Sequence, residues 1–378
     1  MATVLTECPE VPRTWDEPIE TYLSDHNIAC EKATPLTGGN SAYIWRLDGF
    51  KKDGQTHGRS VFKYADTEIK GMVDMEVPAG RMLTEIRALN TTVVQKACEQ
   101  VPYVQIPTVL QTTEEGFVMS WAGEVDLRTA FIQNKDLDAE ALGLRLGKWL
   151  ASLHVAAVGD PGIKTWTNAL IEGVVEREAA HLRTGFRERG IHDDVTERAV
   201  ALLQQPGPVQ TLTVCDFRPM NTLLSSKDSV DATATVVDWE CARYGDPAFD
   251  IRLWAAEAMV MESKYGDGRG LLRSFLQGYV QYAGPEVITS EFVCRVAVVM
   301  GSILFWLMPL GIWDVTDEAE GEQWRLLAVE YIRAGANRDM AWLSKSVLSP
   351  LLANVAQDST RADRKEDGRL PASPISGC

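Results

Sequence analysis

The chain has 378 residues, of which 45% are hydrophobic and 24% charged, a composition typical of a folded globular protein. This length and composition exclude a disulfide-stapled mini-protein and a chain that is disordered throughout. With 37 Lys and Arg against 53 Asp and Glu, the net charge is −16, which repels polyphosphate backbones, so we expect no nucleic-acid partner.

Two features bear on the compartment. The seven cysteines are scattered and never have a metal-binding spacing, and the N-terminus has acids and prolines where a signal peptide needs a basic and then an apolar run. We therefore expect a cytoplasmic protein. Residues 296–313 are long and apolar enough to raise the question of a membrane span. Because the segment contains Gly301, Pro309 and Gly311, a core helix explains it better, and we expect no membrane partner.

The predicted elements begin with a short helix over residues 18–27, after an N-terminal extension over residues 1–17. Three strand-like segments follow, one before Leu36 and the others at residues 42–47 and 60–64, separated by Gly-containing turns. Helical spacing of apolar residues from Val77 to about Gln100 predicts one helix. Strand character returns at residues 103–109 and 116–121. The pattern predicts a small β-rich lobe over residues 18–121, in which one helix interrupts five strands.

Beyond Glu124 the pattern is mostly helical, with one amphipathic helix running from about Leu142 to Leu153. Two short strands interrupt it, and they end in Asp216 and Asp238. We assign residues 122–351 to a larger helical lobe that carries the catalytic and acceptor sites. Residues 357–378 are rich in Asp, Arg, Ser, Gly and Pro and have no apolar period, which predicts a disordered tail over residues 352–378.

The informative segments are V-C-D-F-R-P-M-N, residues 214–221, and D-W-E, residues 238–240. Phosphoryl transfer from ATP needs a carboxylate that accepts the hydroxyl proton, oxygen ligands for Mg²⁺, a cation for the γ-phosphate and a lysine that fixes the donor. Asp216, Asn221 and Asp238 would supply the base and two metal ligands. Lys63, from the third strand, would anchor the phosphates.

Together with Gly38, Gly39, Lys63 and Glu85, these segments resemble the aminoglycoside phosphotransferase, choline kinase and methylthioribose kinase group. The likeness covers residues 18–351 and is closest to fungal small-molecule kinases such as hydroxytryptamine kinase. It implies an α+β, two-lobed protein-kinase-like fold with a small β-rich N-lobe and a larger helical C-lobe. It also implies ATP- and Mg²⁺-dependent phosphorylation of a hydroxyl on a small organic molecule, in fungal secondary metabolism.

The resemblance assigns roles to individual residues. Asp216 matches the catalytic base, Asn221 and Asp238 match the metal ligands, and Glu240 matches a further metal contact. Lys63 matches the nucleotide lysine and Glu85 the helix glutamate that pairs with it. Arg218 falls where protein kinases place a lysine, and its guanidinium would grip the γ-phosphate. The expected nucleotide site comprises Gly38, Gly39, Asn40, Ser41, Lys63, Glu85, Ser120, Trp121 and Ala122, the last three against the adenine.

The expected acceptor pocket faces Asp216 and includes Trp254, Glu257 and Trp306. Aromatic and acidic side chains suit an aromatic alcohol or an amine. For most of these residues the alternative is core packing.

Several local alternatives stay open. Glu76 competes with Glu85 for the lysine, and Gly38 and Gly39 also suit a hairpin turn. Asp246 and Asp250 are expected to cap a helix over residues 251–260. His154 is expected to be a core residue without a catalytic role.

The function also has alternatives. Val214 stands where the family often has His, so a catalytically inactive, nucleotide-binding scaffold remains open, as does a kinase that activates a group for a later step. A protein acceptor is disfavoured because no A-P-E segment and no long activation loop follow D-W-E.

Overall fold

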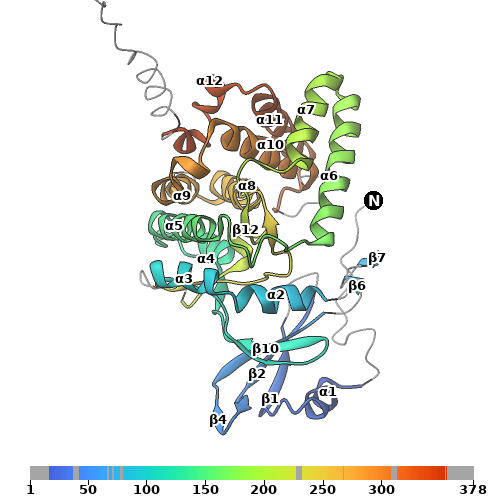
Figure 1. Ribbon diagram of the computed structural model, residues 1–378, viewed down its shortest axis with the longest axis vertical. Helices are drawn as coiled ribbons and strands as arrows, with labels where there is room; N and C mark the ends of the chain where they lie inside the picture. Colours follow the sequence, from blue (N-terminus) through green and yellow to red (C-terminus); the bar gives the residue numbers. More distant parts are fainter. Residues whose placement is uncertain are drawn as a thin grey trace, which may run out of the picture.

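The computed structural model describes residues 17–36, 42–65, 68–69, 72–76, 80–226, 232–266, 268–307, 313–353 and 355. Strands gather at one end of the molecule and helices at the other, and α2 (Arg81–Leu89) runs between the two parts (Figure 1). The expected α+β fold with a β-rich and a helical lobe is confirmed. The predicted extension and tail lie almost entirely outside the described residues, and the exact domain boundaries stay predictions.

The N-terminal sheet is antiparallel throughout and has two different faces. Phe62 and Val118 face a core that includes Leu23 of α1 (Ile19–Asp25), whereas Val61 and Phe117 belong to the core shared with the helices. Strand side chains alternate between faces, so this alternation turns Lys63 toward the helical lobe. The strand order is β1 (Lys32–Pro35), β2 (Tyr43–Asp48), β5 (Arg59–Tyr64), β10 (Gly116–Ser120) and β9 (Val109–Thr112).

Two short hairpins accompany this sheet. They are β3 (Lys51–Lys52) with β4 (Gln55–Thr56), and β6 (Glu68–Ile69) with β7 (Met72–Glu76).

The helical stretch that follows differs from its prediction. Instead of one helix, the chain forms α2 and α3 (Thr92–Gln100), separated at Asn90 and Thr91. The Thr91 side chain accepts a hydrogen bond from the Val93 amide and caps α3, so a new helix begins where periodicity alone continues the old one.

Two small sheets hold the ends of the loops that carry the predicted site residues. The single strand predicted over residues 103–109 is wrong, because two strands share this stretch: β8 (Val104–Gln105), which pairs in parallel with β14 (Ala234–Val236), and β9, which begins at Val109. One small sheet has the order β11 (Val125–Asp126), β13 (Thr222–Leu224), β14 (Ala234–Val236) and β8, and the other pairs β12 (Thr211–Thr213) with β15 (Arg243–Gly245).

Helices make up the rest of the C-terminal lobe (Figure 1). They are α4 (Leu127–Gln133), α5 (Ala139–Ala157), α6 (Ala169–Glu188), α7 (Asp193–Gln204), α8 (Ala248–Tyr265), α9 (Leu271–Val287), α10 (Ser290–Leu307), α11 (Glu318–Ala336), α12 (Met340–Leu343) and the 3₁₀ turns η1 (Pro219–Asn221) and η3 (Ser349–Leu352).

Within the described residues, α10 is the one helix that is long and apolar enough to cross a membrane. Inside the protein, 78% of its residues are buried, as in the core helix of a soluble protein.

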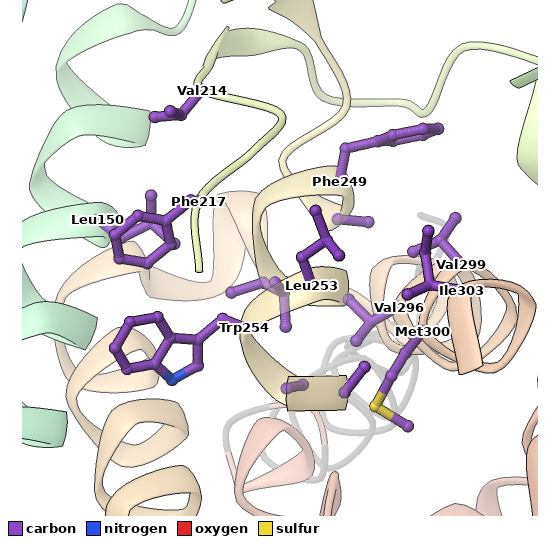
Figure 2. Close-up of a cluster of buried hydrophobic side chains, with 14 of the residues drawn as sticks. Leu150, Val214, Phe217, Phe249, Leu253, Trp254, Val296, Val299, Met300 and Ile303 are labelled. Atoms are coloured by element: carbon purple, nitrogen blue, oxygen red, sulfur yellow. The ribbon is translucent and has the colours of Figure 1, made fainter. Parts of the chain in front are cut away.

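The core also holds the loop after β12. Val214 and Phe217 are fully buried, and Phe217 stacks on Trp254 of α8 with ring centroids 5.0 Å apart. Figure 2 shows the two loop side chains with Leu150 and Trp254. The core therefore anchors the loop on both sides of Asp216.

Candidate active site

Asp216 lies in a loop whose backbone is fixed by a buried carboxylate. Asp250 of α8 accepts hydrogen bonds from the Val214 amide at 2.9 Å and from the Cys215 amide at 2.6 Å. Cys215 has a φ of 63°, a left-handed conformation that costs energy for a residue with a Cβ. These bonds keep the strained residue in place and set the direction in which Asp216 leaves the loop.

Asn221 holds the Asp216 side chain. Its amide nitrogen donates to the Asp216 Oδ2 at 2.7 Å and to the Asp216 carbonyl at 3.0 Å, across the turn η1. Burial raises the pKa of Asp216 to about 7, although Arg218 acts to lower it. A carboxyl with such a pKa is suited to exchange a proton near neutral pH.

A hairpin brings Asn221 close to Asp238. In the β13–β14 ladder Thr222 pairs with Val236, and the Val237 amide donates to the Asn221 carbonyl at 3.0 Å. The sequence separation between Asn221 and Asp238 is thus the length of the β13–β14 hairpin. Asp238 has a φ of 66°, and the strain is moderate because Asp tolerates left-handed backbone better than most residues.

Lys63 connects the sheet to this loop. Its Nζ lies 2.6 Å from the Glu85 Oε2 on α2 and 2.6 Å from the Asp238 Oδ1. Burial would lower the pKa of Lys63, but Asp238, Glu85 and Glu240 outweigh it and raise the pKa well above its usual value. Burial raises the pKa of Glu85 to about 7, against the opposing effect of Lys63. Glu85 is therefore the helix partner of Lys63 in this structure.

The donor set fits a hard divalent cation. Oxygen atoms of Glu85, Asp238 and Glu240 lie within 4.8 Å of one another, and Asn221 adjoins them through the hairpin. Carboxylate and amide oxygens are the ligands that Mg²⁺ takes in phosphate-transferring sites. Of the predicted ligands, the structure thus brings Asp238, Glu240 and Asn221 to one place, next to Glu85, which is paired with Lys63.

Arg218 lies beside the base but is held from α8. Its Nε donates to the Glu257 Oε2 at 2.8 Å, and its Nη2 lies 3.2 Å from the Met220 sulfur. The Glu257 side chain is fully buried, and that of Arg218 is 17% exposed.

The predicted acceptor residues lie in different environments. Trp254 is fully buried between Phe217 and Phe275, so it presents no surface to an acceptor, and Glu257 is fully buried as well. Core packing is the better description of Trp254. Trp306 is partly exposed at the C-terminal end of α10.

The predicted nucleotide residues are described only in part. Gly38, Gly39, Asn40 and Ser41 lie outside the described residues. Ser120 ends β10, and its hydroxyl accepts a bond from the Thr108 amide at 2.9 Å.

The connection after Ser120 is tightly fitted. The Trp121 ring lies under the Arg59 guanidinium at 4.7 Å, and Ala122 is buried. A side chain at Gly123 would come within 2.7 Å of the Leu224 carbonyl, so this connection between the lobes requires glycine.

Asp250 is the functional residue whose role sequence reasoning missed. The sequence predicts that it caps a helix starting at residue 251, but α8 begins at Ala248. There, Asp246 accepts a hydrogen bond from the Ala248 amide at 2.9 Å. Asp250 lies inside the helix, and its carboxylate also contacts the His154 Nε2 at 3.0 Å. His154 is fully buried, as expected, with its Nδ1 2.8 Å from the Tyr279 hydroxyl.

The chain is similar to several solved structures, one of which reaches a TM-score of 0.50. An aminoglycoside phosphotransferase from Alicyclobacillus acidocaldarius is 14% identical, with a TM-score of 0.50, covering 90% of this chain and 98% of its own. A macrolide 2'-phosphotransferase from Brachybacterium faecium is 17% identical, with a TM-score of 0.46 and coverages of 84% and 97%. A choline/ethanolamine kinase family protein from Mesorhizobium loti is 14% identical, with a TM-score of 0.45 and coverages of 86% and 92%.

No curated protein matches the sequence. The likeness to fungal hydroxytryptamine kinase therefore stays a prediction. The sequence profile of the phosphotransferase enzyme family, in contrast, matches residues 79–288, which is more than half of the chain and includes Glu85, Asp216 and Asp238. The chain therefore belongs to the phosphotransferase enzyme family, the family of small-molecule kinases expected from its sequence.

Proposed function

We propose that this protein is an ATP- and Mg²⁺-dependent kinase that phosphorylates a hydroxyl of a small organic molecule, with Asp216 as the catalytic base. The observation that carries the proposal is the convergence of two groups of residues between the lobes. Asp216 and Asn221 form the first group, and Lys63, Glu85 and Asp238 form the second.

The proposed reaction transfers the γ-phosphoryl group. The bond from the γ-phosphorus to the bridging oxygen of ADP breaks, and a bond from the γ-phosphorus to the acceptor oxygen forms. Asp216 takes the hydroxyl proton, and Asn221 holds its carboxylate in the orientation that receives it. When bound, Mg²⁺ would be held by Asp238, Asn221 and Glu240 and would neutralise phosphate charge.

Lys63 would change partners when the nucleotide binds. In this structure its ammonium group forms ion pairs with both Asp238 and Glu85. Asp238 is expected to turn to the metal and Lys63 to contact the donor phosphates, while Glu85 keeps Lys63 in place. The adenine would lie against the connection formed by Ser120, Trp121 and Ala122.

The missing motif histidine does not favour the inactive scaffold. Val214 is fully buried, and its backbone amide makes the bond to Asp250 that fixes the loop. A backbone bond of this kind does not depend on the side chain at position 214.

The acceptor is proposed to be an aromatic or amino alcohol. Trp306, partly exposed on α10, is the remaining aromatic candidate for its wall, because Trp254 lies in the core. Glu257 is paired with Arg218, so its carboxylate is not free to bind an amine of the acceptor.

The test is a screen for acceptor-stimulated ADP release with MgATP. Matched phenols, amino alcohols and sugars serve as acceptors, and the Asp216→Asn variant serves as the control for contaminating kinases. We expect at least one alcohol class to stimulate ADP release by the wild type and none to stimulate it in the variant. Tight MgATP binding without stimulation by any acceptor would instead favour the scaffold.

A further inference from the structure

In the Arg218–Glu257 ion pair, the arginine side chain is partly exposed and the glutamate side chain is fully buried. Arg218 belongs to the loop that carries Asp216, and its side chain is 17% exposed. Glu257 belongs to the middle of α8 and is fully buried. Of the two side chains, only the arginine is therefore accessible from outside.

The contact uses one particular edge of the guanidinium group. The Arg218 Nε, rather than a terminal nitrogen, donates to the Glu257 Oε2 at 2.8 Å. Among the described residues, the Nη2 contacts the Met220 sulfur, at 3.2 Å, and a thioether is a weak acceptor. A phosphoryl oxygen is a far stronger acceptor and could replace that sulfur without disturbing the bond to Glu257.

Charge also couples this pair to the base. Arg218 lies two residues after Asp216 in the same loop, so its positive charge is held near the base. Burial raises the pKa of Glu257, while Arg218 opposes this effect and favours the ionised carboxylate. The buried, ionised glutamate in turn restrains the arginine, because separating the two would remove its main cationic partner and leave only the weaker effects of Arg128 and Trp313.

We propose that Glu257 is a positioning residue that holds the Arg218 guanidinium with its terminal nitrogens toward the phosphoryl group in transfer. This role replaces the expected one, in which Glu257 binds an amine of the acceptor. The inference rests on the proposed kinase function. Glu257 acts entirely through Arg218, so removing its charge should slow transfer without weakening acceptor binding.

The test is a double-mutant cycle of Glu257→Gln and Arg218→Ala, measured as kcat and KM with the best acceptor from the screen. Glu257→Gln alone should lower kcat about tenfold or more and leave both KM values within about twofold. In the Arg218→Ala background the same change should have no further effect on kcat, since the group it positions is gone. Arg218→Lys should recover part of the loss that Arg218→Ala causes, because the charge is kept.

The chain offers a matched control for buried charge. Glu178 of α6 is also fully buried, and it accepts a hydrogen bond from Arg252 of α8 at 2.8 Å. Glu178→Gln should cost similar thermal stability but leave kcat unchanged. If Glu257→Gln fails to fold, Arg218→Lys provides the kcat and KM comparison on its own, with a loss confined to kcat expected.

Several results would overturn the inference. Independent, additive losses in the cycle would do so, as would an unchanged kcat in Glu257→Gln. A rise in KM restricted to amine-bearing acceptors would return Glu257 to the role of an acceptor ligand. Failure of the kinase proposal is distinguishable, because the wild type itself would then show no acceptor-stimulated ADP release.

Discussion

At the scale of single residues, Asp216 has the most direct consequence for activity. We expect Asp216→Asn to lower turnover by at least about a hundredfold, the usual effect of removing a positioned general base. Nucleotide affinity should remain nearly unchanged, because Lys63, Glu85 and Asp238 are left intact. Steady-state kinetics and titration with an ATP analogue measure the two quantities separately. Wild-type turnover in Asp216→Asn on the true acceptor would show that another group accepts the proton.

Residue types and spacing predict part of this site, and the reason is local geometry. Asp216, Asn221 and Asp238 belong to one turn and one hairpin, so short-range sequence already brings them close. Glu257 and Trp254 lie on a helix that is buried on nearly every side, and periodicity cannot say which of its faces meets the site. Asp250 looked like a helix cap because its partners, the amides of residues 214 and 215, are distant in sequence.

At the scale of elements, α5 and α9 depend on glycine for their close approach. A Cβ at Gly147 would lie 2.0 Å from the Phe275 carbonyl and 2.8 Å from the Tyr279 amide. We expect Gly147→Ala to lower the free energy of unfolding by about 2 kcal/mol or more, because backbone atoms cannot move aside cheaply. Chemical denaturation measures the change.

The same substitution at Gly173 is the matched control. Gly173 lies within α6, where the nearest atom to an added Cβ is the Arg177 Nη1 at 3.9 Å. Gly173→Ala should raise the free energy of unfolding by about 0.5–1 kcal/mol, because alanine loses less backbone entropy in a helix. Equal effects at the two positions would contradict the close packing of α5 and α9.

Element types were easier to predict from the sequence than element ends. The strands at β2 and β5 and the helix at α5 appear where alternation or helical spacing is strong. The division of α2 from α3 depends on one capping threonine, and β8 exists only because β14 lies beside it. The pairing of β14 with β8 joins residues more than a hundred positions apart, and a local sequence pattern cannot predict such a contact.

At the scale of the whole molecule, bound MgATP should stabilise the folded protein. A ligand that binds only the native state at a hundred times its Kd adds about 2.7 kcal/mol. We expect a rise in Tm with MgATP and a smaller rise with ATP and a chelator. Asp238→Asn should remove the Mg²⁺-dependent part, because it takes away a charged ligand.

Asparagine is the right replacement at this position. Asp238 has a positive φ, which asparagine adopts more easily than alanine, so the variant separates charge from backbone strain. Asp53, in a surface turn with a φ of 50°, provides the control Asp53→Asn, which should respond to MgATP like the wild type. If Asp238→Asn kept the full Mg²⁺-dependent rise in Tm, the metal would be bound by other residues.

The carboxylate of Asp250 has a consequence for the exchange of backbone hydrogens with solvent. The Val214 and Cys215 amides follow the last residue of β12, so no strand partner protects them. Their acceptor is a fully buried side chain inside α8. These two amides should therefore exchange as slowly as those in the centre of a helix, since exposing them requires α8 to separate from the loop. Hydrogen–deuterium exchange should find this loop among the most protected parts of the chain, and rapid exchange would mean that it opens independently of α8.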